Sequence, residues 1–354
     1  MILNATAVQA KKPEGYSNID IAKFVCSLFV IVIHTSPLSG VSNIVQFYVE
    51  DVITRVAVPL FYAFTGFFFF GKLVFEKGKI VPSTGNLRNL FQYCKKTAVL
   101  YLSWSLAYIV IILMPMWYQT GYWGPFIFKD CLATLLFKGS YYHLWYLLSL
   151  IYAIPLLYGL LCCLDYKKIS VFVFILWICE CLTYSYSWVG VDRIPFVSFI
   201  SDRMPVVFDS LFRAIPLLAV GAFVSQYQPI RQPQKACCAA LLAIFVYAVE
   251  VSVLFFFSPN IENFSYLFST LFFAFTWLVF LISTKQCNIS PHTQLLFRRM
   301  SLIIYCIHPM VLDVLHVFGV SNGFTLWITV TLLSIGLAAG WAVLKQGTQR
   351  KRPF

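Results

Sequence analysis

Three ionisable residues lie within one apolar segment near the N-terminus, NIDIAKFVCSLFVIVIHTSP, which contains Asp20, Lys23 and His34. On a helix, the spacing of Lys23 and His34 is about 20° beyond three full turns, so the two side chains share a face, about 16 Å apart along the axis. Asp20 lies one turn before Lys23, a spacing that permits an ion pair. A neutral histidine can act as a general base near physiological pH. The alternative is that His34 only forms a hydrogen bond to another helix or loop.

Two arginines lie in other apolar segments. Arg55, in ITRVAVPLFYAFTGFFFF, suits recognition of a carboxylate or phosphate, or else reaches the outer surface by snorkelling. In the same segment, Pro59 and Gly66 indicate points where the helix bends or another backbone approaches closely. Arg213 follows Asp209 by four residues, which permits a purely structural ion pair.

Further polar residues in apolar surroundings leave their roles open. In GSYYHLWYLLSLIYAIP, His143 and Tyr146 are either interfacial anchors or residues at the mouth of a cavity. His308 is followed by a proline, so a helix break is as good an explanation as catalysis. Glu180 and Glu250 are either cavity residues or protonated hydrogen-bond donors between helices, and the sequence assigns them no role.

The composition indicates an integral membrane protein. Of the 354 residues, 60% are hydrophobic and 11% charged, whereas soluble domains have about 45–50% apolar and about 25% charged residues. The polar N-terminal segment precedes an uncleaved first span rather than forming a signal peptide. Most of the 11 cysteines lie in apolar runs without a Cys-x-x-Cys pair or histidine cluster, so the sequence predicts no metal site and no disulfide framework.

The expected fold is all-α and polytopic, a single membrane domain over 18–345 between an N-terminal segment, 1–17, and a basic tail, 346–354. The segment 121–138 is too short and polar to span and is expected to be an interfacial or re-entrant helix. Apolar runs of about 20 residues predict transmembrane helices. Ten are expected, at 18–37, 47–71, 91–116, 143–163, 169–188, 206–226, 235–256, 263–284, 299–319 and 324–345.

The basic residues predict the orientation. Nineteen of the 26 fall in the N-terminal segment, the C-terminal tail and the even-numbered loops, and four fall in the odd-numbered loops. Cationic loops are retained in the cytoplasm, so both termini are expected there. Topology therefore explains the net charge of +12 without nucleic acid, and also the basic residues between Lys72 and Lys96, for which a polyphosphate ligand is the alternative. The three remaining cations, Lys23, Arg55 and Arg213, lie within spans.

The sequence contains no phosphate-binding glycine loop, zincin motif or nucleophile elbow. Four segments, in this order, resemble the membrane-bound acyltransferase type 3 family: IDIAKFVCSLFVIVIHTSP, RVAVPLFYAFTGFFFF, YHLWYLLSLIYAIPLL and SLIIYCIHPMVL. The resemblance covers essentially the whole chain. Its first and second segments are closest to the branch that includes the membrane half of the glycopeptide-resistance serine racemases, for which amino-acid uptake has been proposed.

The resemblance implies transfer of an acyl group, commonly acetyl, from cytoplasmic acyl-CoA to a hydroxyl of a cell-envelope sugar or related molecule. It implies that His34 is the catalytic base, that Lys23 is the basic residue of the motif and that Arg55 and His143 lie at a cavity. The family most often has arginine at the position of Lys23, and lysine lacks the bidentate fork of donors.

The sequence thus predicts an O-acyltransferase of the bacterial inner membrane that uses acetyl-CoA or a similar donor and no permanently bound cofactor. The expected catalytic residues are His34, Lys23 and Asp20, and the expected substrate-binding residues are Arg55, Arg213, His143 and Tyr146. A transporter or flippase of a small polar solute such as an amino acid is the alternative. The absence of internal repeats and of paired broken spans argues against it. A third hypothesis is a structural partner in an envelope-polysaccharide assembly.

Overall fold

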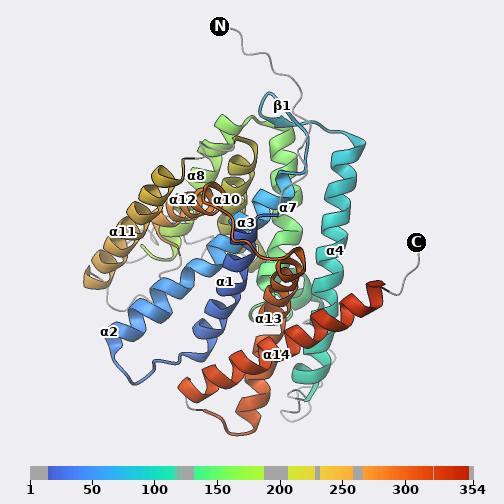
Figure 1. The fold of residues 1–354 in the computed structure, drawn as a ribbon, viewed down its shortest axis with the longest axis vertical. Coiled ribbons are helices and arrows are strands. Elements are labelled where there is room, and N and C mark those ends of the chain that lie inside the picture. The colour runs from blue at the N-terminus through green and yellow to red at the C-terminus, as the bar shows by residue number, and fades with distance from the viewer. Residues whose placement is uncertain are drawn as a thin grey trace.

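The computed structural model describes residues 15–115, 117, 121, 131–186, 206–227, 232–257, 266–321 and 323–350, without the side chains of 206–209 and 345–350. Most of the N-terminal segment, the loop over 189–205 and the end of the basic tail lie outside these residues. The chain is an all-α, multi-pass membrane protein, in which long helices pack side by side (Figure 1).

Each of the ten predicted spans overlaps a helix. In the described part of the chain, eight helical segments are long and apolar enough to cross a membrane; α8 carries more charge and α12 is shorter. The number of crossings and the side of the termini stay predictions. The main helices are α1 (Ser17–Thr35), α2 (Asn43–Gln46), α3 (Ala57–Phe70), α4 (Thr84–Tyr108), α7 (Trp145–Cys163), α8 (Tyr166–Thr183), α10 (Val206–Tyr227), α11 (Pro233–Phe257), α12 (Phe268–Ser283), α13 (Pro291–Val317) and α14 (Gly323–Arg350).

The structure also contains one short β-hairpin, which the prediction of an all-α fold did not include. β1 (Phe75–Glu76) pairs with β2 (Lys79–Ile80) in antiparallel register, in a loop at one end of the bundle (Figure 1). Lys77 and Gly78, the two turn residues, both have positive φ, 49° and 78°, as a two-residue hairpin loop of this kind requires. The ring of Phe75 stacks on Tyr166 at 5.5 Å and fixes the hairpin against the start of α8.

The second span is a composite helix. A π-helical segment, Phe47–Ile53, and a 3₁₀ turn, Thr54–Val56, precede α3. Pro59 is the third residue of α3 and lacks an N–H, so it cannot donate to the carbonyl of Arg55. The irregularity predicted for this span is therefore present, and it lies on the N-terminal side of Pro59.

Residues 131–138 are helical and end in a π-helical segment, Thr134–Lys138, before Gly139 at φ 87°. The hydroxyl of Tyr101 on α4 donates to the carbonyl of Leu135 at 2.6 Å, which attaches this segment to the bundle. The preceding residues 122–130 lie outside the described part of the chain, so an interfacial or re-entrant helix over 121–138 stays a prediction.

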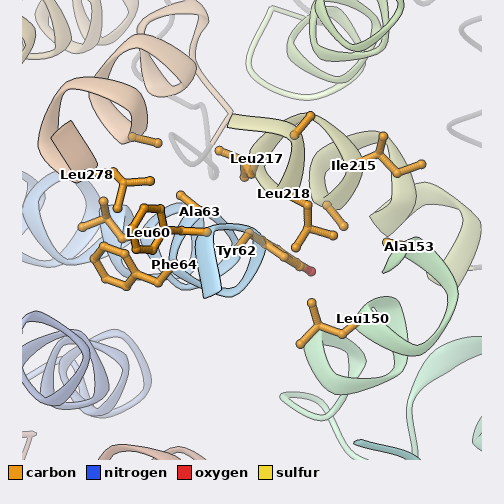
Figure 2. Packing of buried hydrophobic residues seen from close by; sticks show 14 of the residues in the cluster. Leu60, Tyr62, Ala63, Phe64, Leu150, Ala153, Ile215, Leu217, Leu218 and Leu278 are labelled. Carbon is orange, nitrogen blue, oxygen red and sulfur yellow. The ribbon is translucent and has the colours of Figure 1, made fainter. Parts of the chain in front are cut away.

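α3 and α10 cross at two glycines. A Cβ atom on Gly66 would lie 2.2 Å from the carbonyl oxygen of Leu218, and one on Gly221 would lie 2.1 Å from that of Ala63. The close backbone approach predicted for Gly66 is thus confirmed. Figure 2 shows the apolar packing beside this crossing, where side chains of α3, α7 and α10 meet.

Glu250 on α11 has a structural role that the sequence left open. Its carboxylate accepts the backbone N–H groups of Phe268 and Ser269 at 2.7 and 2.8 Å, and also the hydroxyl of Tyr186. These N–H groups open α12, and the first N–H groups of a helix have no partner within it. A carboxylate there satisfies them and complements the positive end of the helix dipole.

We predict that Gly221→Ala destabilises the protein, because the added methyl group would overlap the α3 backbone. Overpacking of this kind costs about 1–3 kcal/mol. The measurement is the thermal unfolding midpoint in detergent, and the matched control is Gly336→Ala on α14, where nothing lies within 4 Å of an added Cβ. Alanine is the better helix former by about 1 kcal/mol, so the control should not lower the midpoint. Equal midpoints for both variants would contradict the crossing.

Candidate active site

Three histidines from distant parts of the chain meet in the bundle. The rings of His34 on α1 and His308 on α13 stack with centroids 5.4 Å apart and an interplanar angle of 25°. His143, immediately before α7, lies with its ring centroid 5.6 Å from that of His308. His308 is fully buried, His143 is 3% exposed and His34 is partly exposed. The structure therefore brings together His34 and His143, and adds His308, whose role the sequence left undecided.

The position of His34 follows from the way α1 ends and from its direction. Ser36 adopts a left-handed conformation with φ 42°, and Pro37 follows, so His34 lies in the last turn of α1. α1 runs parallel to α13, since Asp20 contacts Arg298 near the start of both helices and His34 contacts His308 further along. Parallel packing is what alternating crossings require of the first and ninth spans.

His143 is held through its backbone. The hydroxyl of Tyr305 on α13 donates to the His143 carbonyl, and the N–H of Leu144 donates to the carbonyl of Tyr141 at 2.9 Å to close the turn. Tyr146, the second residue of α7, is buried rather than at a surface, so it is not an interfacial anchor. Its hydroxyl bonds to Thr65 at 3.3 Å, and its ring contacts Tyr305 at 5.5 Å.

The hydrogen bonds of these rings are incomplete. The Nδ1 atom of His308 lies 2.9 Å from the carbonyl oxygen of Ile304, which can only accept, so Nδ1 carries the proton. Nε2 of His308 is then a bare lone pair. Among the described residues, neither this buried atom nor either ring nitrogen of His143 has a hydrogen-bond partner. Buried polar groups in native proteins are nearly always bonded, so these three atoms indicate a place for a ligand or water.

The hydrogen-bond ladder of α13 is open beside His308. Pro309 has no N–H to donate to the carbonyl of Tyr305. One position on, the hydroxyl of Tyr108 from α4 accepts the N–H of Met310 at 3.2 Å and donates to the carbonyl of Cys306 at 2.8 Å. These two backbone groups would bond to each other in a regular helix. The inserted hydroxyl keeps them satisfied and fixes α4 against the turn that carries His308.

Aromatic rings border the histidines on one side. Tyr142 contacts the ring of His34 edge-on at 5.0 Å and is 45% exposed. Tyr141 stacks on Tyr108 at 4.4 Å, and its hydroxyl donates to the carboxylate of Asp313 at 2.5 Å. Tyr142 is thus an exposed residue in direct contact with the ring of His34.

At the other end of α1, the structure corrects the predicted pair of Asp20 with Lys23. Nε of Arg298 donates to Oδ1 of fully buried Asp20 at 2.7 Å. The Lys23 ammonium instead lies over the ring of Phe68, 4.3 Å from its centroid. The predicted span began at residue 299, which left Arg298 in the preceding loop. In the structure Arg298 belongs to α13 and reaches Asp20 from this neighbouring helix.

Arg55 and Arg213 occupy different environments. Arg55 pairs with Asp51 one turn earlier at 3.3 Å and lies close enough to His34 to interact with it electrostatically. Arg213 forms a buried ion pair with Glu180 at 2.9 Å. Its guanidinium also lies over the rings of Tyr266, Trp145 and Tyr184 at 4.4, 5.3 and 5.3 Å. The side chain of Asp209, the predicted partner of Arg213, lies outside the described part of the chain.

The chemistry that the side chains of the cluster can supply is proton transfer. Across the described ranges, no group of three histidine, cysteine, aspartate or glutamate side chains is placed to hold a metal ion. The cluster presents imidazole nitrogens that can accept a proton in surroundings with little water. The sequence signal for His308 was its place in SLIIYCIHPMVL, but spacing along the chain could not place it against His34.

Residues 16–345 match the family described as the acyltransferase domain. An amino-acid racemase of Enterococcus faecalis is 32% identical over 167 residues, which are 47% of this chain and 22% of that protein. A serine/alanine racemase of Enterococcus gallinarum is 25% identical over 358 residues, 94% of this chain and 48% of that protein. The chain thus spans less than half the length of either relative. No solved structure matches it.

We predict that Arg298→Met destabilises the protein by leaving the Asp20 carboxylate buried without its partner. Breaking a fully buried pair costs about 3–5 kcal/mol. Arg298 is 43% exposed, so solvent screening lowers the expected loss to about 1–3 kcal/mol. The measurement is chemical unfolding in detergent, with the double variant Asp20→Asn/Arg298→Met as the control. If the pair is real, the double variant recovers stability relative to Arg298→Met, and additive losses would contradict it.

Proposed function

Because the chain belongs to the acyltransferase family whose domain it matches over nearly its whole length, we propose that it is a membrane O-acyltransferase acting on the cell envelope. The donor is an acyl-CoA such as acetyl-CoA, and the acceptor is a hydroxyl of an envelope sugar or a related molecule. The location is the bacterial cytoplasmic membrane. The observation that carries the proposal is the cluster of His34, His143 and His308, in which ring nitrogens of His143 and His308 have no partner among the described residues.

His34 is the base in this proposal. Its imidazole takes the proton from the acceptor hydroxyl as the oxygen attacks the thioester carbonyl. Collapse of the tetrahedral intermediate breaks the carbon–sulfur bond, and the proton passes to the CoA thiolate. The partial exposure of His34 gives the acceptor access to the ring, beside the exposed side chain of Tyr142.

Lys23 contributes at the other end of α1. Asp20, Arg298 and Lys72 are near enough to act electrostatically on its ammonium group, so three cations and one carboxylate leave an excess of positive charge at this end. The diphosphate and 3′-phosphate of CoA are the matching chemistry, since a lysine ammonium binds phosphate as a point charge. The length of α1 between Lys23 and His34 then corresponds to the arm that carries the thioester.

Uptake of an amino acid is the second candidate. The Glu180–Arg213 pair, enclosed by Trp145, Tyr184 and Tyr266, offers both charges that the carboxylate and ammonium groups of an amino acid would need. The relatives named as amino-acid and serine/alanine racemases point to the same class of molecule. Acyl-CoA binding separates the two candidates, because a transporter of amino acids has no use for it.

We predict that His34→Ala abolishes acyl transfer while the protein still folds and inserts, because removing a general base lowers the rate by about 10²–10⁴-fold. The measurement is mass spectrometry of envelope glycans from cells that express each variant in place of the wild type. His292→Ala, at the exposed start of α13, is the control and should leave acylation unchanged. Normal acylation by His34→Ala would remove this residue from the mechanism.

We predict that purified protein binds acetyl-CoA and that Lys23→Met weakens binding about tenfold, because a hydrogen bond to a charged group contributes about 1.5–3 kcal/mol. Calorimetric titration in detergent measures the affinity. Lys167→Met removes an exposed lysine on α8 and serves as the control for lost charge. A wild-type protein that binds no acyl-CoA would favour the transporter instead.

A further inference from the structure

His308 is the member of the cluster whose geometry is most fully determined, and the proposed mechanism with His34 as base does not use it. Its ring is fully buried and stacks on the ring of His34. The bond from Nδ1 to the Ile304 carbonyl fixes both the tautomer and the rotation of the ring. The Tyr108 hydroxyl bonds to the Cys306 carbonyl and to the N–H of Met310, and these two bonds fix the backbone of the turn that carries His308.

This arrangement leaves one atom, Nε2, as an acceptor without a donor among the described residues. A bare acceptor in a buried site costs free energy if nothing ever bonds to it. A donor, or a positive charge beside the ring, offsets that cost. The stacked neighbour, His34, becomes such a charge when it takes a proton.

Acid–base histidines in other enzymes are commonly served by a fixed acceptor that orients the ring and stabilises the imidazolium, as the aspartate of a Ser-His-Asp triad does. The carboxylate of Asp313 accepts the Tyr141 hydroxyl. That of buried Glu50 accepts the N–H of Leu38, four residues after His34. Asp20 accepts from Arg298 at the other end of α1. Those carboxylates are thus engaged elsewhere, and His308 is the acceptor that contacts the ring of His34.

We propose that His308 is a positioning residue for the acyl transfer, whose neutral ring, stacked on His34 with Nε2 unprotonated, stabilises His34 once it holds the proton of the acceptor hydroxyl. This inference rests on the proposed function. It adds no chemical step, because the proton still moves from the acceptor oxygen to His34 and then to the CoA sulfur.

The test compares substitutions that keep or remove the acceptor atom. His308→Phe keeps an aromatic ring beside His34 but has no nitrogen. His308→Gln places an amide oxygen, an acceptor, close to the position of Nε2. His308→Leu removes both ring and acceptor and provides the apolar comparison if the Phe variant does not fold. Each purified variant is assayed for folding by acetyl-CoA binding and for acetyl transfer by its kcat and its KM for acetyl-CoA.

We expect His308→Phe and His308→Leu to lower kcat by about 100-fold or more, as for loss of a group that serves a general base, with KM for acetyl-CoA within about twofold of wild type. His308→Gln should recover at least about tenfold of the loss. The control, His316→Phe, replaces an exposed histidine on the same helix and should leave both constants unchanged.

Two results would overturn the inference. One is a Phe variant that retains more than a tenth of the wild-type kcat, which would show that the ring alone suffices. The other is equal loss in the Gln and Leu variants, which would show that the acceptor atom has no part. In both cases the wild type still transfers acetyl groups and the proposed function stands. A wild-type protein that transfers nothing from acetyl-CoA would overturn the proposed function itself.

Discussion

The packing of α1 along α13 is the contact on which the rest of the arrangement depends. Hydrocarbon offers polar side chains no water, and a charge at the centre of a membrane helix costs about 2.5–3.5 kcal/mol on insertion scales. α1 carries Asp20, Lys23 and His34 on a helix that is otherwise largely apolar, and Asp20 and His34 determine how it faces α13. On α13, Arg298 pairs with Asp20 and His308 stacks on His34. With both contacts made, the two helices are fixed in direction, register and rotation.

Much of the helical framework could be predicted from hydropathy, but the helix ends could not. α4 begins at Thr84 and α13 at Pro291, each well before the apolar run that predicted it. The reason lies in the caps. The hydroxyl of Ser83 accepts the N–H of Asn86, and that of Ser290 accepts the N–H of Thr293. A serine of this kind starts a helix in the polar region, whereas hydropathy reports only where the helix enters the apolar one.

The same distinction explains the outcome at the site. Hydropathy correctly placed Lys23 and His34 on one helix, α1, because an apolar run is a property of a single segment. Asp20 pairs with Arg298, and Arg213 pairs with Glu180. In each pair the two residues lie on different helices. Local i,i+3 and i,i+4 rules cannot detect such pairs. The role of His308 stayed undecided for the same reason, since it depends on a contact with the ring of His34, which lies on another helix.

The Tyr108 hydroxyl within α13 has a consequence for how molecules reach the histidines. One turn of α13 obtains its backbone hydrogen bonds from α4 rather than from itself. Parting α4 from α13 would therefore break both bonds to the Tyr108 hydroxyl, and the turn would have to close so that the N–H of Met310 and the carbonyl of Cys306 bond to each other. Lateral entry from the bilayer between these two helices would thus have to break this link and rebuild one turn of α13. A lipid-linked acceptor that presents its hydroxyl by another route would leave the turn beneath His308 undisturbed.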